Sequence, residues 1–89
     1  MYRAAINGHA GAVSALARLG ADLDAREDSV GFTALMGAAY HGKVECARAL
    51  LAGGADRTLR ATGGAWKGET ALQLAEEEGE AEVAALLRE

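Results

Sequence analysis

The chain has 89 residues, enough for one small domain, and 22 of them are alanine. Aromatic residues make up only 4%, so the bulky side chains that a broad sheet sandwich requires are missing. The formal net charge of −4 disfavours a general binder of phosphate backbones, and the single cysteine, Cys46, excludes an internal disulfide. We therefore expect short alanine-rich helices that end at glycines, in an intracellular protein, cytoplasmic or nuclear.

Internal repetition indicates the architecture. With a shift of 34 residues, the run Gly20-Ala21-Asp22 falls on Gly54-Ala55-Asp56. With a shift of 37 residues, the run Thr33-Ala34-Leu35 falls on Thr70-Ala71-Leu72. Because both shifts meet in the same central segment, we predict one repeat domain over residues 1–89, divided into a partial first repeat (1–30), a second repeat (31–67) and a C-terminal capping repeat (68–89).

Each unit is predicted to be a pair of short helices. The first unit begins inside a helix, because Met1 aligns with Leu35. We expect the sequence to be part of a longer array; the alternative is a frayed N-terminal helix. In the later units, Thr33 and Thr70 are predicted N-caps. The helices predicted there span residues 34–41, 44–52, 71–78 and 81–88. A helix pair of this size cannot bury its own apolar face, so stacking must stabilise it.

Three motifs resemble the ankyrin repeat: Gly-x-Thr-x-Leu, Ala-Ala-x-x-Gly and Leu-Leu-x-x-Gly-Ala-Asp. The family's Thr-Pro-Leu-His signature is replaced by Thr33-Ala34-Leu35-Met36 and Thr70-Ala71-Leu72-Gln73, which lack both the proline and the histidine. The resemblance implies an all-α fold with short β-hairpin connections, in which about three helix-turn-helix repeats stack as a solenoid. It also implies that the long connection over residues 57–67 projects with an extended, flexible tip at Gly63-Gly64.

The predicted core consists of apolar residues that recur at helix-facing positions. Alanines among them allow the helices to approach closely. The predicted core residues are Leu16, Leu19, Leu35, Leu50, Leu51, Leu72, Leu74, Val83, Leu86 and Leu87, with Ala5, Ala38, Ala39 and Ala75.

No catalytic, cofactor or metal site is predicted. His9, His41 and Cys46 lack the spacing of zinc ligands, and Cys46 is interpreted as a small buried hydrophobe. For His9, the resemblance implies a structural hydrogen bond. The Gly63 to Thr70 segment has the glycine spacing of a phosphate-binding loop but carries Glu69 where that loop needs lysine. A nucleotide-binding enzyme is therefore the weakest hypothesis.

A partner-binding surface is predicted more strongly than any catalytic, metal or nucleotide site. The resemblance implies that hairpin tips and the exposed face of the first helices contact the partner. The corresponding residues are Ile6, Asn7, Ser29, Val30, Phe32, Tyr40, His41, Trp66, Lys67, Glu69, Glu77 and Glu78, which include three of the four aromatic residues. Alternatively, Phe32 packs onto the neighbouring hairpin and Trp66 covers its own loop.

The predicted function is a non-enzymatic protein-protein interaction scaffold, a monomer that binds another protein and neither nucleic acid nor a membrane. Arg57, Arg60 and Lys67 would favour an acidic edge on the partner, and Glu77 and Glu78 a basic one. Residues 68–89 carry seven acids against one base, a net charge of −6, which indicates a solvated cap or an acidic docking patch. The alternative function is a structural spacer or C-terminal cap of a longer repeat array in a multidomain protein.

Overall fold

Six α-helices arranged in three consecutive pairs make up the fold. The computed structural model describes all of residues 1–89. Its helices are α1 (Tyr2–Ile6), α2 (Ala10–Arg18), α3 (Ala34–Tyr40), α4 (Val44–Ala52), α5 (Ala71–Glu77) and α6 (Ala81–Arg88), with a 3-10 turn, η1 (Gly64–Trp66), before α5. The predicted helix pairs of the second and third units are confirmed, although α3 and α5 end one residue earlier than expected.

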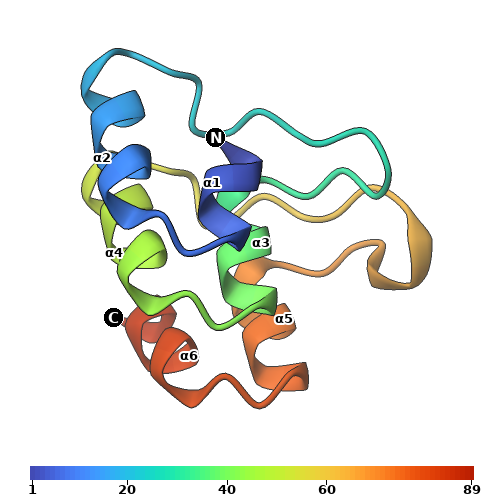
Figure 1. The fold of residues 1–89 in the computed structure, drawn as a ribbon. Helices are drawn as coiled ribbons and strands as arrows, with labels where there is room; N and C mark the ends of the chain where they lie inside the picture. The colour runs from blue at the N-terminus through green and yellow to red at the C-terminus, as the bar shows by residue number, and fades with distance from the viewer.

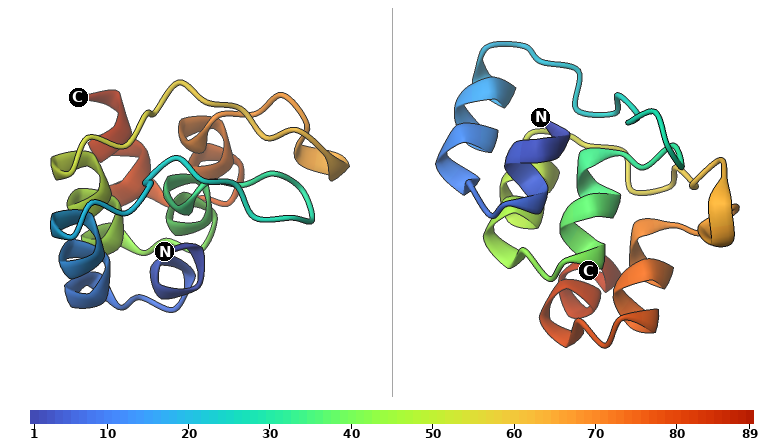
Figure 2. Two further views of the ribbon diagram at one scale, coloured as in Figure 1. Left: turned by 90° about the horizontal axis from the view of Figure 1, so that it is seen from above. Right: turned by 45° about the vertical axis from the view of Figure 1, so that its right-hand side comes forward.

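The pairs stack so that the helices form two layers. In Figure 1, α1, α3 and α5 descend side by side in one layer, and α2, α4 and α6 descend in the other. Figure 2 shows that the connections 19–33 and 53–70 both project from the same side of this stack. The all-α repeat fold that the sequence predicted is therefore confirmed.

Threonine caps set where α3 and α5 begin. Thr33 Oγ1 accepts a hydrogen bond from the Met36 N–H at 3.3 Å. In α5, Thr70 Oγ1 accepts from the Gln73 N–H at 3.3 Å, while Gln73 Oε1 accepts from the Thr70 N–H at 2.8 Å. This reciprocal pair is a capping box, which satisfies two otherwise orphaned donors at the helix start. Both predicted N-caps are confirmed.

The repeated Gly-Ala-Asp run has the same structural role in both places. Gly20 and Gly54 adopt positive φ angles of 86° and 97°, which glycine accepts without the penalty of a side chain. Beyond them, Asp22 Oδ1 accepts from the Asp24 N–H at 3.0 Å, and Asp56 Oδ1 accepts from the Thr58 N–H at 2.8 Å. The run therefore ends the second helix of a pair and turns the chain into the connection.

The core lies between the two helix layers and across the pairs. Most of the predicted core residues are buried or half-buried there, including Leu35, Leu50 and Leu74, which are at most 1% exposed. The prediction for Leu19 is wrong, because this side chain is 82% exposed. Leu19 aligns with Gly53, whose position faces the preceding pair, and the same face of the first pair meets solvent here.

The connections contain almost no strand. One isolated antiparallel bridge, between Arg60 and Thr70, replaces the β-hairpin that the resemblance implied. The tip is extended at Gly63, where φ is −152°, but Gly64 has a φ of +68° and starts the turn η1. The expectation of an extended tip is therefore wrong from Gly64 onward. Trp66, at the end of η1, packs back onto the stack and not outward.

The two connections are tied to each other. Arg26 Nη1 donates to the carbonyl oxygens of both Gly31 and Arg60 at 2.7 Å. The Thr62 N–H donates to the Val30 carbonyl oxygen at 3.1 Å. These contacts hold the second connection against the first, and they fix where the side chains of η1 lie relative to α3.

Candidate functional site

Three of the four aromatic residues meet beside the second connection: Phe32 just before α3, Tyr40 at the end of α3 and Trp66 at the end of η1. The centroid of the Trp66 ring lies 5.7 Å from that of Phe32 and 5.6 Å from that of Tyr40, both in edge-to-face geometry. The rings of Phe32 and Tyr40 lie 6.2 Å apart. We call these three residues the aromatic cluster. Aromatic ring pairs at such distances stabilise the fold by more than the burial of their apolar area alone would.

The members of the aromatic cluster differ in their exposure. Phe32 is only 4% exposed, so its predicted place on the contact surface is wrong. It packs down onto the ring of Trp66 from the neighbouring connection, as the alternative interpretation stated. Tyr40 and Trp66 remain half-buried. Phe32 therefore supports the two outer rings, and those two rings are partly exposed.

Ile6, Asn7, Ser29 and Val30 belong to the first pair and the first connection, and the remaining predicted site residues lie at the end of α3, on the second connection and at the end of α5. His41, the C-cap of α3, is exposed and its ring lies 5.1 Å from that of Tyr40. Lys67 is exposed directly after Trp66. At the next pair, Glu69 is half-buried, while Glu77 and Glu78 are exposed at the end of α5. We call Tyr40, His41, Trp66, Lys67, Glu69, Glu77 and Glu78 the contact surface.

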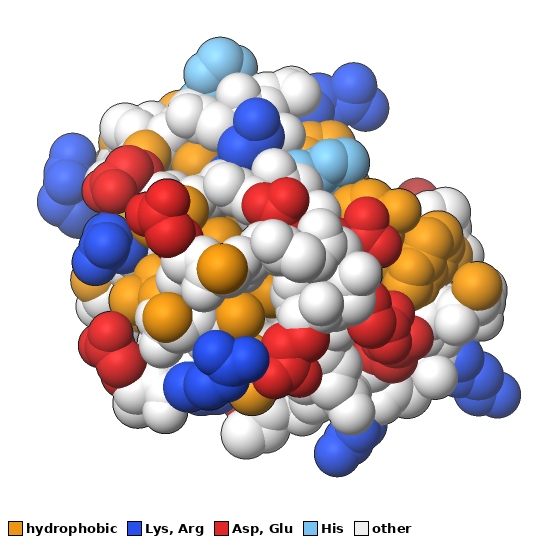
Figure 3. Space-filling model, turned by 90° about the horizontal axis from the view of Figure 1, so that it is seen from below, with side chains coloured by type: hydrophobic (Ala, Val, Ile, Leu, Met, Phe, Trp, Pro, Cys, Tyr) orange, Lys and Arg blue, Asp and Glu red, His pale blue; other side chains and the backbone are white.

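Glu69 and Glu77 form a pair of neighbouring carboxyl groups. A hydrogen bond with Glu77, together with burial and the charge of Glu77, raises the pKa of Glu69. The Oε1 atom of Glu69 is buried and receives no hydrogen bond from any donor of the chain. In Figure 3, acidic side chains lie beside a hydrophobic area on the right of the molecule. The contact surface thus combines aromatic rings with carboxyl groups, of which Glu69 has one oxygen without a donor.

Two arginines that the sequence suggested for an acidic partner are engaged within the fold. Arg57 Nη1 donates to the carbonyl oxygens of Leu87 and Glu89 at 2.9 and 3.0 Å. Arg60 Nη1 donates to the carbonyl oxygen of Gly68 at 2.8 Å. Arg57 therefore binds backbone carbonyls at the end of α6, and Arg60 binds one just after η1.

Sequence reasoning missed Glu27, which organises the first connection. Its Oε2 atom accepts from the N–H and hydroxyl of Ser29 at 2.8 and 2.6 Å. Its Oε1 atom accepts from the N–H groups of Val30 and Phe32 at 2.8 and 3.1 Å. The Ser29 hydroxyl and these backbone N–H groups lower the pKa of Glu27 to about 2. A glutamate two residues before a serine is a weak sequence signal, because the four donors converge only in the folded loop.

Replacing Glu27 with glutamine is expected to lower the free energy of unfolding by about 1 kcal/mol at neutral pH, since an amide offers one acceptor atom to four donors. The folded pKa of about 2 lies below the ordinary 4.5, so the carboxylate stabilises the fold above 4.5 and this contribution disappears as the pH falls toward 2. Urea unfolding across this range should show the difference between wild type and Glu27→Gln shrinking with acidity. Asp28→Asn, at an exposed neighbour, is the control. A difference that is independent of pH would contradict the assignment.

Cys46 and His9 have no visible part in a reactive site. Cys46 is 1% exposed, which confirms its interpretation as a buried hydrophobe, and burial raises the pKa of its thiol. The structural hydrogen bond implied for His9 is absent: its side chain is exposed and caps nothing at the start of α2. Neither side chain forms a hydrogen bond or ion pair with a residue of the contact surface.

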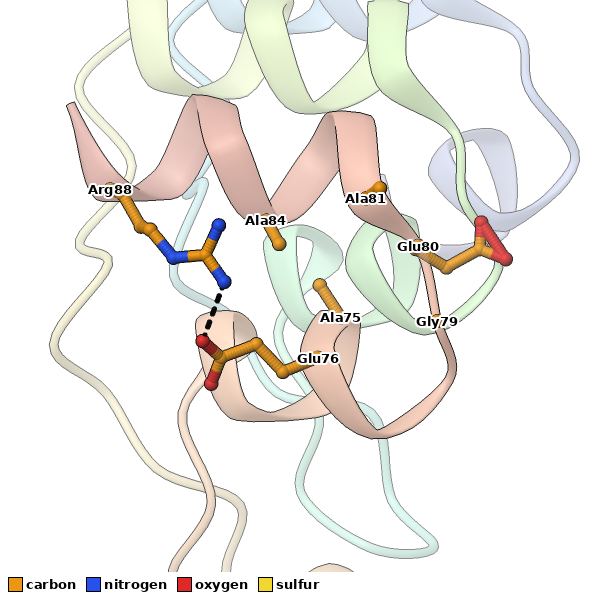
Figure 4. Close-up of a pocket in the computed structure, with 7 residues that line it drawn as sticks. All are labelled: Ala75, Glu76, Gly79, Glu80, Ala81, Ala84 and Arg88. Carbon is orange, nitrogen blue, oxygen red and sulfur yellow. Dashed lines mark hydrogen bonds and ion pairs between the residues drawn. The ribbon is translucent and has the colours of Figure 1, made fainter.

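A hollow of about 350 Å³ lies at the end of the stack, between α5 and α6. Figure 4 shows its alanine walls and the ion pair across it, in which Arg88 Nη2 lies 2.8 Å from Glu76 Oε2. Its lining residues are Ala75, Glu76, Gly79, Glu80, Ala81, Ala84 and Arg88. None of these lining residues belongs to the contact surface. No helix of the protein is both long and apolar enough to cross a lipid bilayer.

Stacked helix pairs with connections projecting to one side define a helical repeat protein. A family model described as ankyrin repeats, in three copies, matches residues 1–89. The chain belongs to the ankyrin repeat family, as the motifs suggested. Ankyrin repeats are protein-interaction modules, and the family is non-catalytic.

The chain is also similar to part of two curated mammalian proteins. It is 46% identical over 61 residues to the ankyrin repeat and SAM domain-containing protein 6 of Mus musculus. It is 44% identical over 61 residues to the protein of that name from Rattus norvegicus. Each alignment covers 68% of this chain but only 7% of the relative, so the chain spans a small part of their length.

Proposed function

We propose that this ankyrin repeat stack is a non-enzymatic module that binds one partner protein through the contact surface. The observation that carries the proposal is the convergence of Phe32, Tyr40 and Trp66, which leaves two of the rings partly open. Aromatic side chains that are held in place bury a large area at low entropic cost, and they are frequent anchors of interfaces. The stack itself needs no cofactor for this task.

The mechanism is docking onto a surface that is organised before the partner arrives. Phe32 supports the open rings from below, and the contacts of Arg26 and Glu27 hold the connections that carry them. A surface fixed in this way loses little conformational freedom on binding, so more of the interaction free energy appears as affinity. The exposed His41, Glu77 and Glu78 form the polar rim that surrounds such anchors.

The Tyr40→Ala/Trp66→Ala double variant is expected to bind at least about tenfold more weakly than wild type, because it removes both anchors. A random peptide library displayed on phage is selected on the wild-type protein, and the enriched peptides are then titrated calorimetrically against both proteins.

Leu19→Ala removes an exposed apolar side chain outside the contact surface and is the matched control. Because the double variant also alters packing against Phe32, Tyr40→Leu and Trp66→Leu, which keep apolar bulk, are titrated alongside, and unfolding curves confirm that each variant is folded. Equal affinity of wild type and folded double variant would refute this surface.

The second candidate function is a structural spacer or cap within a longer multidomain protein. It is favoured by the two relatives, whose name includes a SAM domain and of whose length the aligned segment covers only 7%. Under this alternative, variants of the contact surface leave all binding unchanged, whereas variants that unfold the stack abolish the activity of the longer protein.

A further inference from the structure

The acidic half of the contact surface has no cationic partner within the chain. The two ion pairs of the structure join Arg48 to Glu45 and Arg88 to Glu76, at 3.4 and 2.8 Å. Glu69, Glu77 and Glu78 take part in neither, although Lys67 follows the same turn. Carboxylates held close together without a cation are stabilised when a positive charge arrives from outside.

Glu69 is the centre of this unbalanced charge. Its Oε1 atom is buried and accepts no hydrogen bond, which leaves an acceptor unsatisfied at a cost in free energy. A hydrogen bond with the Glu77 carboxyl group raises the pKa of Glu69, and burial and the charge of Glu77 raise it further. A cationic donor placed against the solvent-facing side of the two carboxyl groups would supply the missing charge and donate hydrogen bonds to their accessible oxygens.

Aromatic rings adjoin the carboxyl pair. The Glu69 N–H donates to the Trp66 carbonyl oxygen at 2.9 Å, which fixes the glutamate against the turn that carries the tryptophan. The Trp66 ring in turn contacts that of Tyr40, at a centroid distance of 5.6 Å. Cations are attracted to the faces of such rings. A cation with several N–H donors satisfies both features, and a planar cation can in addition stack on the ring.

We infer that the surface formed by Tyr40, Trp66, Glu69 and Glu77 binds an arginine side chain in an exposed segment of the partner, an inference that rests on the proposed function. A guanidinium group stacks on an aromatic ring and presents paired N–H donors to a carboxylate, whereas the ammonium of lysine is a more strongly hydrated point charge. Charge complementarity also favours a cationic ligand, because residues 68–89 carry a net charge of −6. The side chains of Arg57 and Arg60 are already engaged with backbone carbonyls.

The test uses three blocked pentapeptides, acetyl-Gly-Gly-X-Gly-Gly-amide, in which X is arginine, lysine or citrulline. Citrulline keeps the shape of arginine without its charge. Binding is followed by nitrogen-proton NMR shifts of the Trp66 indole and the Glu69 amide, and by emission of Trp66, the single tryptophan of the chain. The arginine peptide is expected to shift these signals with millimolar affinity, about five times or more tighter than the lysine peptide, and the citrulline peptide is expected to shift nothing.

The Glu69→Gln/Glu77→Gln variant is expected to bind the arginine peptide about five to ten times more weakly than wild type. Glu82→Gln/Glu89→Gln removes the same charge from exposed positions of the last pair, and this control is expected to bind like wild type. Absence of shifts with the arginine peptide, equal binding of lysine or citrulline, or equal loss in the control variant would each overturn the inference.

The same variants separate this inference from the proposed function. If the peptides selected from the library lose affinity for Tyr40→Ala/Trp66→Ala but bind Glu69→Gln/Glu77→Gln like wild type, the contact surface is correct and the arginine assignment is wrong. If the library peptides bind all variants equally, the proposed function fails and the inference fails with it.

Discussion

Leu50→Ala is expected to lower the free energy of unfolding by about 2–5 kcal/mol, the largest loss we expect from a single side chain in this protein. Leu50 is fully buried in α4, which lies between α2 and α6. Removing its isobutyl group takes away buried apolar area and leaves a cavity that rigid neighbouring helices fill only in part. Because the central pair contacts both of its neighbours, the loss should weaken the whole stack.

Urea unfolding followed by far-ultraviolet circular dichroism measures this effect, with Leu19→Ala as the matched control. Both variants make the same chemical change, but Leu19 is 82% exposed, so its replacement should shift the free energy of unfolding by no more than about 0.5 kcal/mol. Similar losses in the two variants would show that stability does not depend on the interface between the pairs.

Gly31→Ala is expected to destabilise the protein by about 2–4 kcal/mol, through two separate effects. Gly31 has a φ of 71°, a conformation in which a side chain is strained. A Cβ atom there would also overlap Thr62 Oγ1 and come within 3.2 Å of the Thr62 nitrogen, where the two connections meet. The variant should therefore push the second connection away from the first and separate Trp66 from Phe32.

Gly79→Ala isolates the first effect, because Gly79 has nearly the same φ, 72°, and open space around the added Cβ. It should cost only about 1–2 kcal/mol. Adding Thr62→Ala to Gly31→Ala removes the overlapping hydroxyl and should recover part of the difference. Equal destabilisation by Gly31→Ala and Gly79→Ala in thermal unfolding would show that the connections do not meet closely at Gly31.

The sequence predicted the helix pairs well because their signals are local. Thr33 and Thr70 mark the starts of helices, and Gly20 and Gly54 mark their ends, through hydrogen bonds and φ angles within a few residues. Repetition also predicted the stack, since recurring apolar positions imply recurring contacts. The alignment placed Tyr40 and Trp66 on the same side of the protein, and the structure brings their rings into contact.

Long-range contacts explain where prediction from the sequence failed. Leu19 and Leu50 occupy similar apolar contexts in the sequence, but Leu50 is in α4, which contacts α2 and α6, whereas Leu19 is the C-cap of α2 in the first pair. Phe32 is aromatic, as interface anchors often are, yet the ring of Trp66 covers it. Glu27 carried no recognisable motif, because its donors come together only when the loop closes.

The sequence alone determined the family, the helix pairs and the region in which a contact surface would lie, because capping, glycine turns and repetition act over short distances along the chain. Only the tertiary structure decided which rings are open, which carboxylates meet and which arginines are engaged with backbone carbonyls. Those outcomes depend on how the second connection rests on the first and on α3. That arrangement is set by packing and hydrogen bonds between residues far apart in the chain.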